Sequence, residues 1–95
     1  MDPNLYAEIT NLRARIRAER EVSQRLFAQV EALVERFPAS PDALILRGDA
    51  IQLGDGSGPE LIEARRSYER ALELDPSNRE AVNEIQMWDE IHGGT

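Results

Sequence analysis

The sequence predicts a small all-α protein: a single domain, 1–95, that forms a short array of helical hairpins with about five helices. Three observations predict this fold class. Helix-forming residues dominate, apolar residues recur at spacings of three and four, and nearly all prolines and glycines fall between the periodic stretches. A chain this short has room for one core, so we expect each apolar stripe to be packed.

Between the first two prolines no glycine interrupts the chain, and the apolar residues follow a heptad-like spacing. These residues are Leu5, Ile9, Leu12, Ile16, Leu26, Val30, Leu33 and Phe37. Two polar residues, Glu19 and Ser23, interrupt the stripe. One interpretation is a degenerate pair of antiparallel helices, 4–20 and 23–36, with Ser23 as the N-cap of the second. The other is one long helix, 5–37, which would leave half of its stripe uncovered unless it dimerised.

The third helix is expected at 41–53. Pro38 ends the preceding helix, Ser40 is placed to cap the next one, and Pro41 suits its first turn. Gly48 lies inside this helix, where glycine costs about 1 kcal/mol relative to alanine. We therefore expect another helix to approach closely at Gly48.

The glycine-rich segment 54–58 predicts a flexible loop, with Ser57 or Gly58 near the cap of a fourth helix, 59–74. The segment Asp-Pro-Ser-Asn ends that helix and caps a last one, 79–91. The acidic residues of this last helix are expected to make its outer face polar; they are Glu80, Glu84, Asp89 and Glu90.

A shift of 38 residues superposes the chain on itself, with Pro38 on Pro76 and Glu31 on Glu69. A period in the thirties is typical of helical solenoids. The unit 41–76 carries a pattern of large and small residues made of Leu44, Gly48, Ile51, Ala64, Tyr68, Ala71 and Pro76. This pattern resembles the tetratricopeptide repeat (TPR) family. The match covers 41–78 well, 23–40 partly and the first twenty residues not at all.

The resemblance implies how these helices pack. Gly48 and Ala64 would be the small residues at which the two helices of a pair touch. Tyr68 and Ala71 would face the following helix. The last helix, 79–91, would act as a capping helix.

The composition argues against several classes of function. The net charge of −7 disfavours binding to nucleic acids or anionic membranes. The absence of cysteine and lysine removes thiolate and Schiff-base chemistry, and the one histidine, His92, sits beside two glycines at the chain end. Asp49 and Asp55 lack EF-hand spacing. We therefore expect no enzyme activity, no cofactor and no metal site. Without a signal peptide or apolar span, a full-length chain would be cytoplasmic.

The resemblance implies a protein-protein interaction module that binds a peptide or partner helix in a groove lined by the first helix of each pair. The candidate groove residues are Arg13, Arg17, Arg47, Ile51, Asn83 and Gln86.

Two further features have alternative interpretations. The face shared by Arg13, Arg17 and Arg20 is either a solvated surface or an anchor for an acidic segment of a partner or of a second copy. Trp88 either packs into the core or forms an exposed docking patch with its neighbours Met87 and Ile91.

Two other functions remain open. A homodimer could form through the long helix 5–37, as a structural oligomerisation module. Alternatively, the chain could be a TPR subunit of an assembly or chaperone complex.

Overall fold

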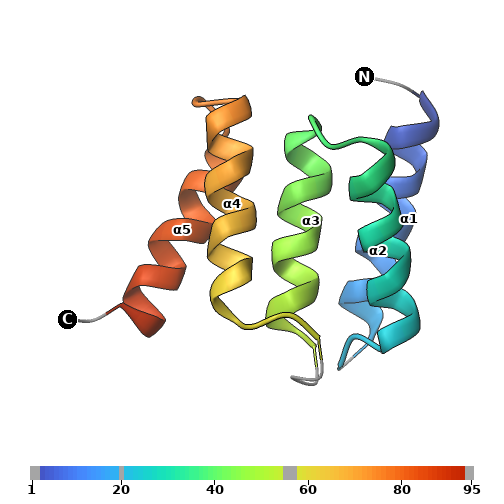
Figure 1. Cartoon of the computed structure of the whole chain (residues 1–95), viewed down its shortest axis with the longest axis horizontal. Helices are drawn as coiled ribbons and strands as arrows, with labels where there is room; N and C mark the ends of the chain where they lie inside the picture. Colours follow the sequence, from blue (N-terminus) through green and yellow to red (C-terminus); the bar gives the residue numbers. More distant parts are fainter. Residues whose placement is uncertain (1–2, 20, 55–57, 94–95) are drawn as a thin grey trace.

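Five helices account for most of the computed structural model, which describes residues 3–19, 21–54 and 58–93 (Figure 1). They are α1 (Pro3–Ala18), α2 (Gln24–Arg36), α3 (Pro41–Gln52), α4 (Ile62–Leu74) and α5 (Arg79–His92). Within the described residues no strand forms, apart from an isolated bridge between Val22 and Gly54. The expected all-α helical array is confirmed.

The first two helices are separate. Ser23 is extended, and its Oγ accepts a hydrogen bond of 3.1 Å from the N–H of Leu26, which caps α2. The turn is also held from outside, because the N–H of Val22 donates to the carbonyl oxygen of Leu53 at 2.9 Å. The alternative of one helix over 5–37 is therefore wrong. The polar interruption of the stripe marked the true helix boundary.

The heptad-like stripe is buried inside the domain. All but one of its apolar residues are buried, from Leu5 to Leu33, and Phe37 is half-buried. They pack with residues of α3 such as Leu46 and Ala50 in one cluster. The stripe is therefore not exposed for the dimer that the long helix would have formed.

The caps of α3 and α5 are where the sequence predicts them. Ser40 Oγ accepts from the N–H of Ala43 at 3.2 Å, with Pro41 in the first turn. Asn78 Oδ1 accepts from the N–H of Ala81 at 3.0 Å. A side-chain acceptor three residues before the N–H that it caps is a local feature, which explains why these starts are predictable.

The fourth helix begins at Ile62, three residues later than the predicted Pro59. No side chain caps it, and Leu61 already has helical backbone angles. The N–H groups of Glu63 and Ala64 instead bond to carbonyls three residues back, at 2.9 and 3.0 Å. Pro59 thus precedes a tight turn that leads into α4, and the tightened turn takes the place of a cap.

Three expectations concern residues that lie outside the described part of the chain. The flexible loop expected at 54–58 falls mostly on such residues, 55–57. Ser57, a possible cap of the fourth helix, is one of them. Arg20, expected on the arginine face of the first helix, is another.

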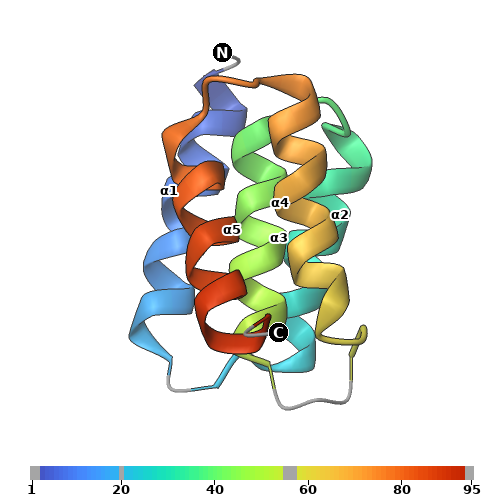
Figure 2. The ribbon, with the colours of Figure 1, turned by 90° about the vertical axis from the view of Figure 1, so that its left-hand side faces the viewer.

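Helix α3 lies at the centre of the molecule, with α1 and α5 on one side and α2 and α4 on the other (Figures 1 and 2). The contact with α4 is close: a Cβ at Gly48 would lie 2.5 Å from Cε1 of Tyr68. Gly48 therefore permits the approach that the sequence predicts. None of the described helices is long and apolar enough to cross a membrane.

Tyr68 lies between the helices on either side of α4. It meets the following helix α5, as the resemblance implies, because it shares a cluster with Ala81 and Trp88 and bonds to Glu84. Its ring also lies over Gly48 of the preceding helix α3. Its hydroxyl also bonds to Asp49 and Gln52 of α3. Because glycine leaves a gap on α3, the large side chain of α4 fills it.

The core has two clusters. One joins α1, α2 and α3, and the other joins α3, α4 and α5. Phe27 and Val34 of α2 pack against both. Trp88 is buried in the second cluster, so its interpretation as a core residue is confirmed, whereas Met87 and Ile91 are exposed.

Candidate functional site

A groove lined by both charged and apolar residues runs along the side of α3 that faces α1 and α5, and we call it the α1–α3–α5 groove. Residues at helical spacings of three and four on the three helices line it: Arg13, Ile16, Arg17, Leu46, Asp49, Gln52, Leu53, Glu80 and Glu84. Its volume is about 320 Å³. Side chains from three helices that are distant in the sequence thus converge on one surface.

A hydrogen-bonded chain forms the base of the groove. The hydroxyl of Tyr68, which is fully buried, donates to Asp49 Oδ1 at 2.7 Å and accepts from Gln52 Nε2 at 2.7 Å. Burial, followed by the negative charge of Asp49, raises the pKa of Tyr68. The hydroxyl therefore stays protonated and acts as a donor, which excludes it as a base at neutral pH.

Burial raises the pKa of Asp49 to about 6. The hydrogen bond from Tyr68 opposes this effect, the charges of Glu84 and Glu80 reinforce it, and Arg13 opposes it. Burial and the charge of Glu80 also raise the pKa of Glu84. The charged forms of Asp49 and Glu84 are therefore disfavoured in the groove.

The opposite wall is basic. Arg13 Nη2 lies 3.6 Å from Glu80 Oε1, and both side chains are partly exposed. Arg13 Nε is buried and has no hydrogen-bond acceptor among the described residues. Arg17 is exposed one turn further along α1. The groove thus has arginines on the α1 wall and carboxylates on the α3 and α5 walls.

The predicted site residues divide between different surfaces. Arg13 and Arg17 lie in the groove. Asn83 and Gln86 are exposed on α5 but are not among the residues that line it. Trp88 is buried and stacks on His92, with ring centroids 4.0 Å apart.

Arg47 and Ile51 lie away from the groove, although the sequence analysis places them in it. Arg47 Nε donates to Glu31 Oε1, and Nη1 donates to Ser67 Oγ at 2.6 Å. Ile51 is buried and lines a second cavity. Arg47 and Ile51 point from α3 in a different direction from Asp49. The sequence pattern alone did not predict which neighbouring helices each direction faces.

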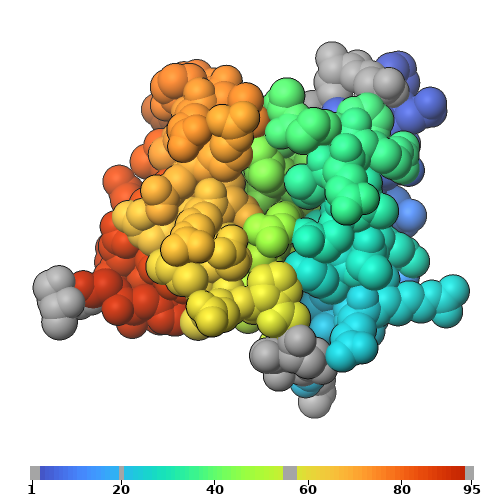
Figure 3. Space-filling view, in the orientation of Figure 1, coloured from blue at the N-terminus to red at the C-terminus, as the bar shows by residue number. Residues whose placement is uncertain are grey.

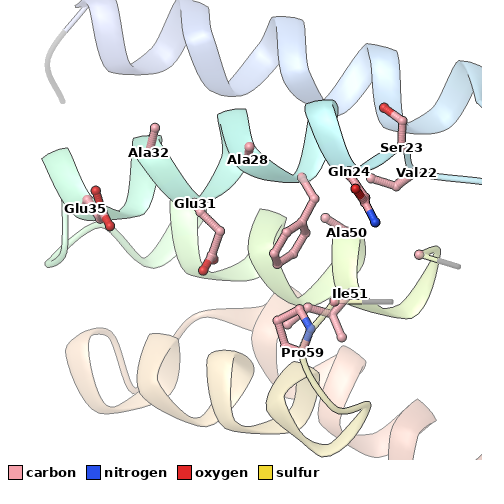
Figure 4. A pocket seen from close by; sticks show the side chains of 13 residues that line it. Val22, Ser23, Gln24, Ala28, Glu31, Ala32, Glu35, Ala50, Ile51 and Pro59 are labelled. Carbon is pink, nitrogen blue, oxygen red and sulfur yellow. The ribbon is translucent and has the colours of Figure 1, made fainter. Parts of the chain in front are cut away.

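The second cavity, which we call the α2–α3 cavity, opens on the face formed by α2 and α4, where Figure 3 shows a hollow between them. Its volume is about 400 Å³. Figure 4 shows its residues along α2 and, across from them, those of α3 and the turn before α4. The described residues that line it are Val22, Ser23, Gln24, Phe27, Ala28, Glu31, Ala32, Glu35, Ala50, Ile51, Gly54, Gly58 and Pro59.

The sequence analysis missed Asp49, and it assigned Glu80 and Glu84 to the outer face of the last helix. Both glutamates are half-buried and line the groove. A signal for Asp49 was present, since it is an acid that follows the glycine at which a close helix approach is expected. The four-residue spacing of Glu80 and Glu84 likewise indicated a shared helix face, but not which neighbour that face meets.

In comparisons with protein-family models, curated proteins and solved structures, this chain matches none of them.

Proposed function

We propose that this protein is a non-catalytic interaction module that binds a peptide or helix of a partner protein in the α1–α3–α5 groove. Two considerations support the proposal. The helical hairpins and their small-residue contacts resemble a TPR array, and the first helix of each pair contributes to the groove. A cytoplasmic location and membership of the TPR family are parts of the same proposal.

The observation that carries the proposal is the convergence of charged, partly buried side chains in the groove. Asp49 and Glu84 are held where burial raises their pKa values, and Arg13 keeps a buried Nε without an acceptor in the described part of the chain. Such groups lower the stability of a small domain. Strained charges gather at functional sites more often than elsewhere, and a bound partner would supply the missing contacts.

The charge pattern defines the partner. An acidic side chain suits Arg17, in keeping with the acidic partner that the sequence predicts. A hydrogen-bond donor or a cation suits Glu84, which lines the same groove on α5. The partner segment therefore carries both signs of charge, with the acid over α1 and the base over α5.

The experiment exchanges the charges on two walls of the groove without changing its net charge. The groove variant combines Arg17→Glu with Glu84→Arg. Phage-displayed random peptides of about 12 residues, about three helical turns, are selected on the wild type and counter-selected on this variant. We expect selected peptides to bind the groove variant at least about tenfold more weakly, as measured by fluorescence anisotropy.

The matched control combines Arg70→Glu with Glu73→Arg, which reverses an exposed ion pair on α4 away from the groove. This control should bind the peptides like the wild type, and peptide-induced NMR shifts should map to α1, α3 and α5. Equal binding to the groove variant, shifts confined to α2, or no peptide with a Kd below about 1 mM would contradict the proposal.

Among the other functions, the dimer through a long helix has lost its basis, because its stripe is buried within the domain. The role as a subunit of an assembly or chaperone complex stays a prediction.

A further inference from the structure

The α2–α3 cavity is separate from the α1–α3–α5 groove and lies on the other side of α3. The large apolar residues Phe27, Ile51 and Pro59 are among those that line the cavity. At about 400 Å³ it falls within the range of roughly 300–1,000 Å³ that is typical of ligand pockets. The cavity can therefore accept one or two large apolar side chains.

The way in which α2 and α4 are joined explains why the cavity stays open. Gly48 brings α4 tightly onto α3, whereas α2 packs mainly on α3 from the other direction. A polar link joins α2 and α4, since Arg47 of α3 bonds to Glu31 of α2 and to Ser67 of α4. Arginine ties the two helices together without filling the space with apolar atoms.

The wall formed by α2 is suited to a helix. Gln24, Ala28, Ala32 and Glu35 follow one another at spacings of four and three along this wall (Figure 4). The first and the last lie 11 positions apart, or about 16 Å along the helix, which is close to three helical turns. Ala28 and Ala32 are exposed and carry only methyl groups, so another helix can approach α2 closely.

The charge of the cavity selects its occupant. The charged residues that line the described part of the cavity are both acidic, Glu31 and Glu35. Glu31 pairs with Arg47, but Glu35 is exposed and takes part in none of the ion pairs found among residues 3–19, 21–54 and 58–93. The net charge of −7 opposes a second copy of the same chain. A cationic partner is favoured instead.

We propose that the α2–α3 cavity binds a basic amphipathic helix of another protein, which inserts an apolar side chain between Phe27 and Ile51 and places a lysine or arginine beside Glu35. The inserted side chain supplies affinity through burial, and the cation sets the orientation along α2. This surface is independent of the groove in the proposed function.

The probe is a fluorescent synthetic helix of about 14 residues with leucine at spacings of three and four and lysine elsewhere. Its matched control replaces each lysine with glutamate. We expect the basic helix to bind the wild type, the acidic helix to bind at least about tenfold more weakly, and added salt to weaken the basic complex. Equal binding of the two helices, or no binding of the basic one, would overturn the proposal.

Two variants locate the site. Ala28→Trp places a bulky side chain on the α2 wall of the cavity, and Glu35→Lys reverses a charge on the same wall. Each should weaken binding of the basic helix at least about tenfold. The controls are Ala14→Trp, on an exposed position of α1, and Glu73→Lys, on an exposed position of α4. Both controls should bind like the wild type, and unchanged binding by both cavity variants would refute the site.

Two further measurements separate this proposal from its rivals. The groove variant, with Arg17→Glu and Glu84→Arg, should retain the basic helix, so the two surfaces can fail independently. Sedimentation should show a monomer. A wild-type dimer that Ala28→Trp dissolves would assign the surface to a second copy and overturn the proposed occupant.

Discussion

Asp49 and Tyr68 are joined because of the residue that precedes Asp49. Gly48 admits the ring of Tyr68 against α3, and the hydroxyl then reaches Asp49 and, one turn on, Gln52. The hydrogen bonds satisfy the polar atoms but do not cancel the cost of burying the carboxylate, which raises its pKa to about 6. This cost should be visible as a pH dependence of stability.

The first prediction concerns Asp49→Asn, which keeps an oxygen acceptor for Tyr68 and removes the charge. The folded-state pKa of Asp49, about 6, lies above the ordinary aspartate pKa of 3.8. Its contribution to stability is thus complete below pH 3.8 and is lost as the pH rises through 6. Relative to the variant, the wild type should gain on the order of 1 kcal/mol between pH 7 and pH 4, measured by urea unfolding.

Asp89→Asn is a control for which the pH dependence of stability should have the opposite sign. The hydrogen bond from Arg65 lowers the pKa of Asp89, so the wild type should lose stability relative to this variant as the pH falls. A difference between the wild type and Asp49→Asn that stays constant from pH 4 to pH 7 would show that Asp49 is not strained.

At the scale of elements, the packing of α3 on α4 depends on the absence of one side chain. Ala64 and Ala71 of α4 are fully buried, and Gly48 of α3 lies under Tyr68. These small residues let the two backbones approach, and the large ring fills the remaining space. The sequence predicts this close approach because an interior glycine is otherwise unfavourable in a helix.

The second prediction is that Gly48→Ala destabilises the protein although alanine favours helices. The new Cβ would lie 2.5 Å from Cε1 and 2.6 Å from Cζ of Tyr68, and the buried ring has no free space to enter. Overpacking should outweigh the gain in helix propensity, for a net loss of about 1–2 kcal/mol in the free energy of unfolding.

Gly58→Ala provides the comparison, because a Cβ there would meet no atom within 4 Å. It should change the free energy of unfolding by less than about 0.5 kcal/mol. If urea unfolding shows that Gly48→Ala is as stable as the wild type, the close contact of α3 with α4 is not a constraint on this position.

The helix boundaries show what local sequence can predict. Ser23, Ser40 and Asn78 cap helices within hydrogen-bonding reach along the chain, so their roles are readable without a tertiary structure. The start of α4 at Ile62 was missed because no side chain caps it, and proline alone marks a turn as readily as a first helical residue.

At the scale of the whole molecule, the two core clusters share Phe27 and Val34. In helical arrays, units fold cooperatively only when the interfaces between them are strong. Trp88, the only tryptophan, lies in the second cluster, so its fluorescence reports on that cluster, whereas circular dichroism reports on all helices. The two signals can therefore measure the coupling between the clusters.

The third prediction is that both signals give one coincident urea transition in the wild type. Phe27→Ala should lower the stability by about 2 kcal/mol and separate the transitions, because it removes a side chain shared by the clusters. Helicity from α1 and α2 should then be lost before the Trp88 signal changes.

Tyr6→Ala removes an aromatic ring of similar size that is 64% exposed, and its transitions should remain coincident. Coincident transitions in Phe27→Ala would show that the contact between the clusters does not depend on this side chain.

The sequence by itself determined most of the helix boundaries and the residues of the inner stripe, whereas the structure decided that 4–37 forms two helices and not one. These features follow from capping side chains, prolines and apolar spacing, all of which act within a few residues of one another. The sequence also determined the acidic surface and the close approach at Gly48.

Only the tertiary structure decided which polar residues meet. It separated Arg47 and Ile51 from Arg13 and Arg17, and it brought Asp49 to Tyr68. Each of these outcomes depends on how far one helix is rotated against another. One residue position on a helix corresponds to a rotation of about 100°, which is enough to move a side chain of α3 from the α1–α3–α5 groove to the α2–α3 cavity. The spacing of the apolar residues does not specify such a rotation for the polar positions beside them.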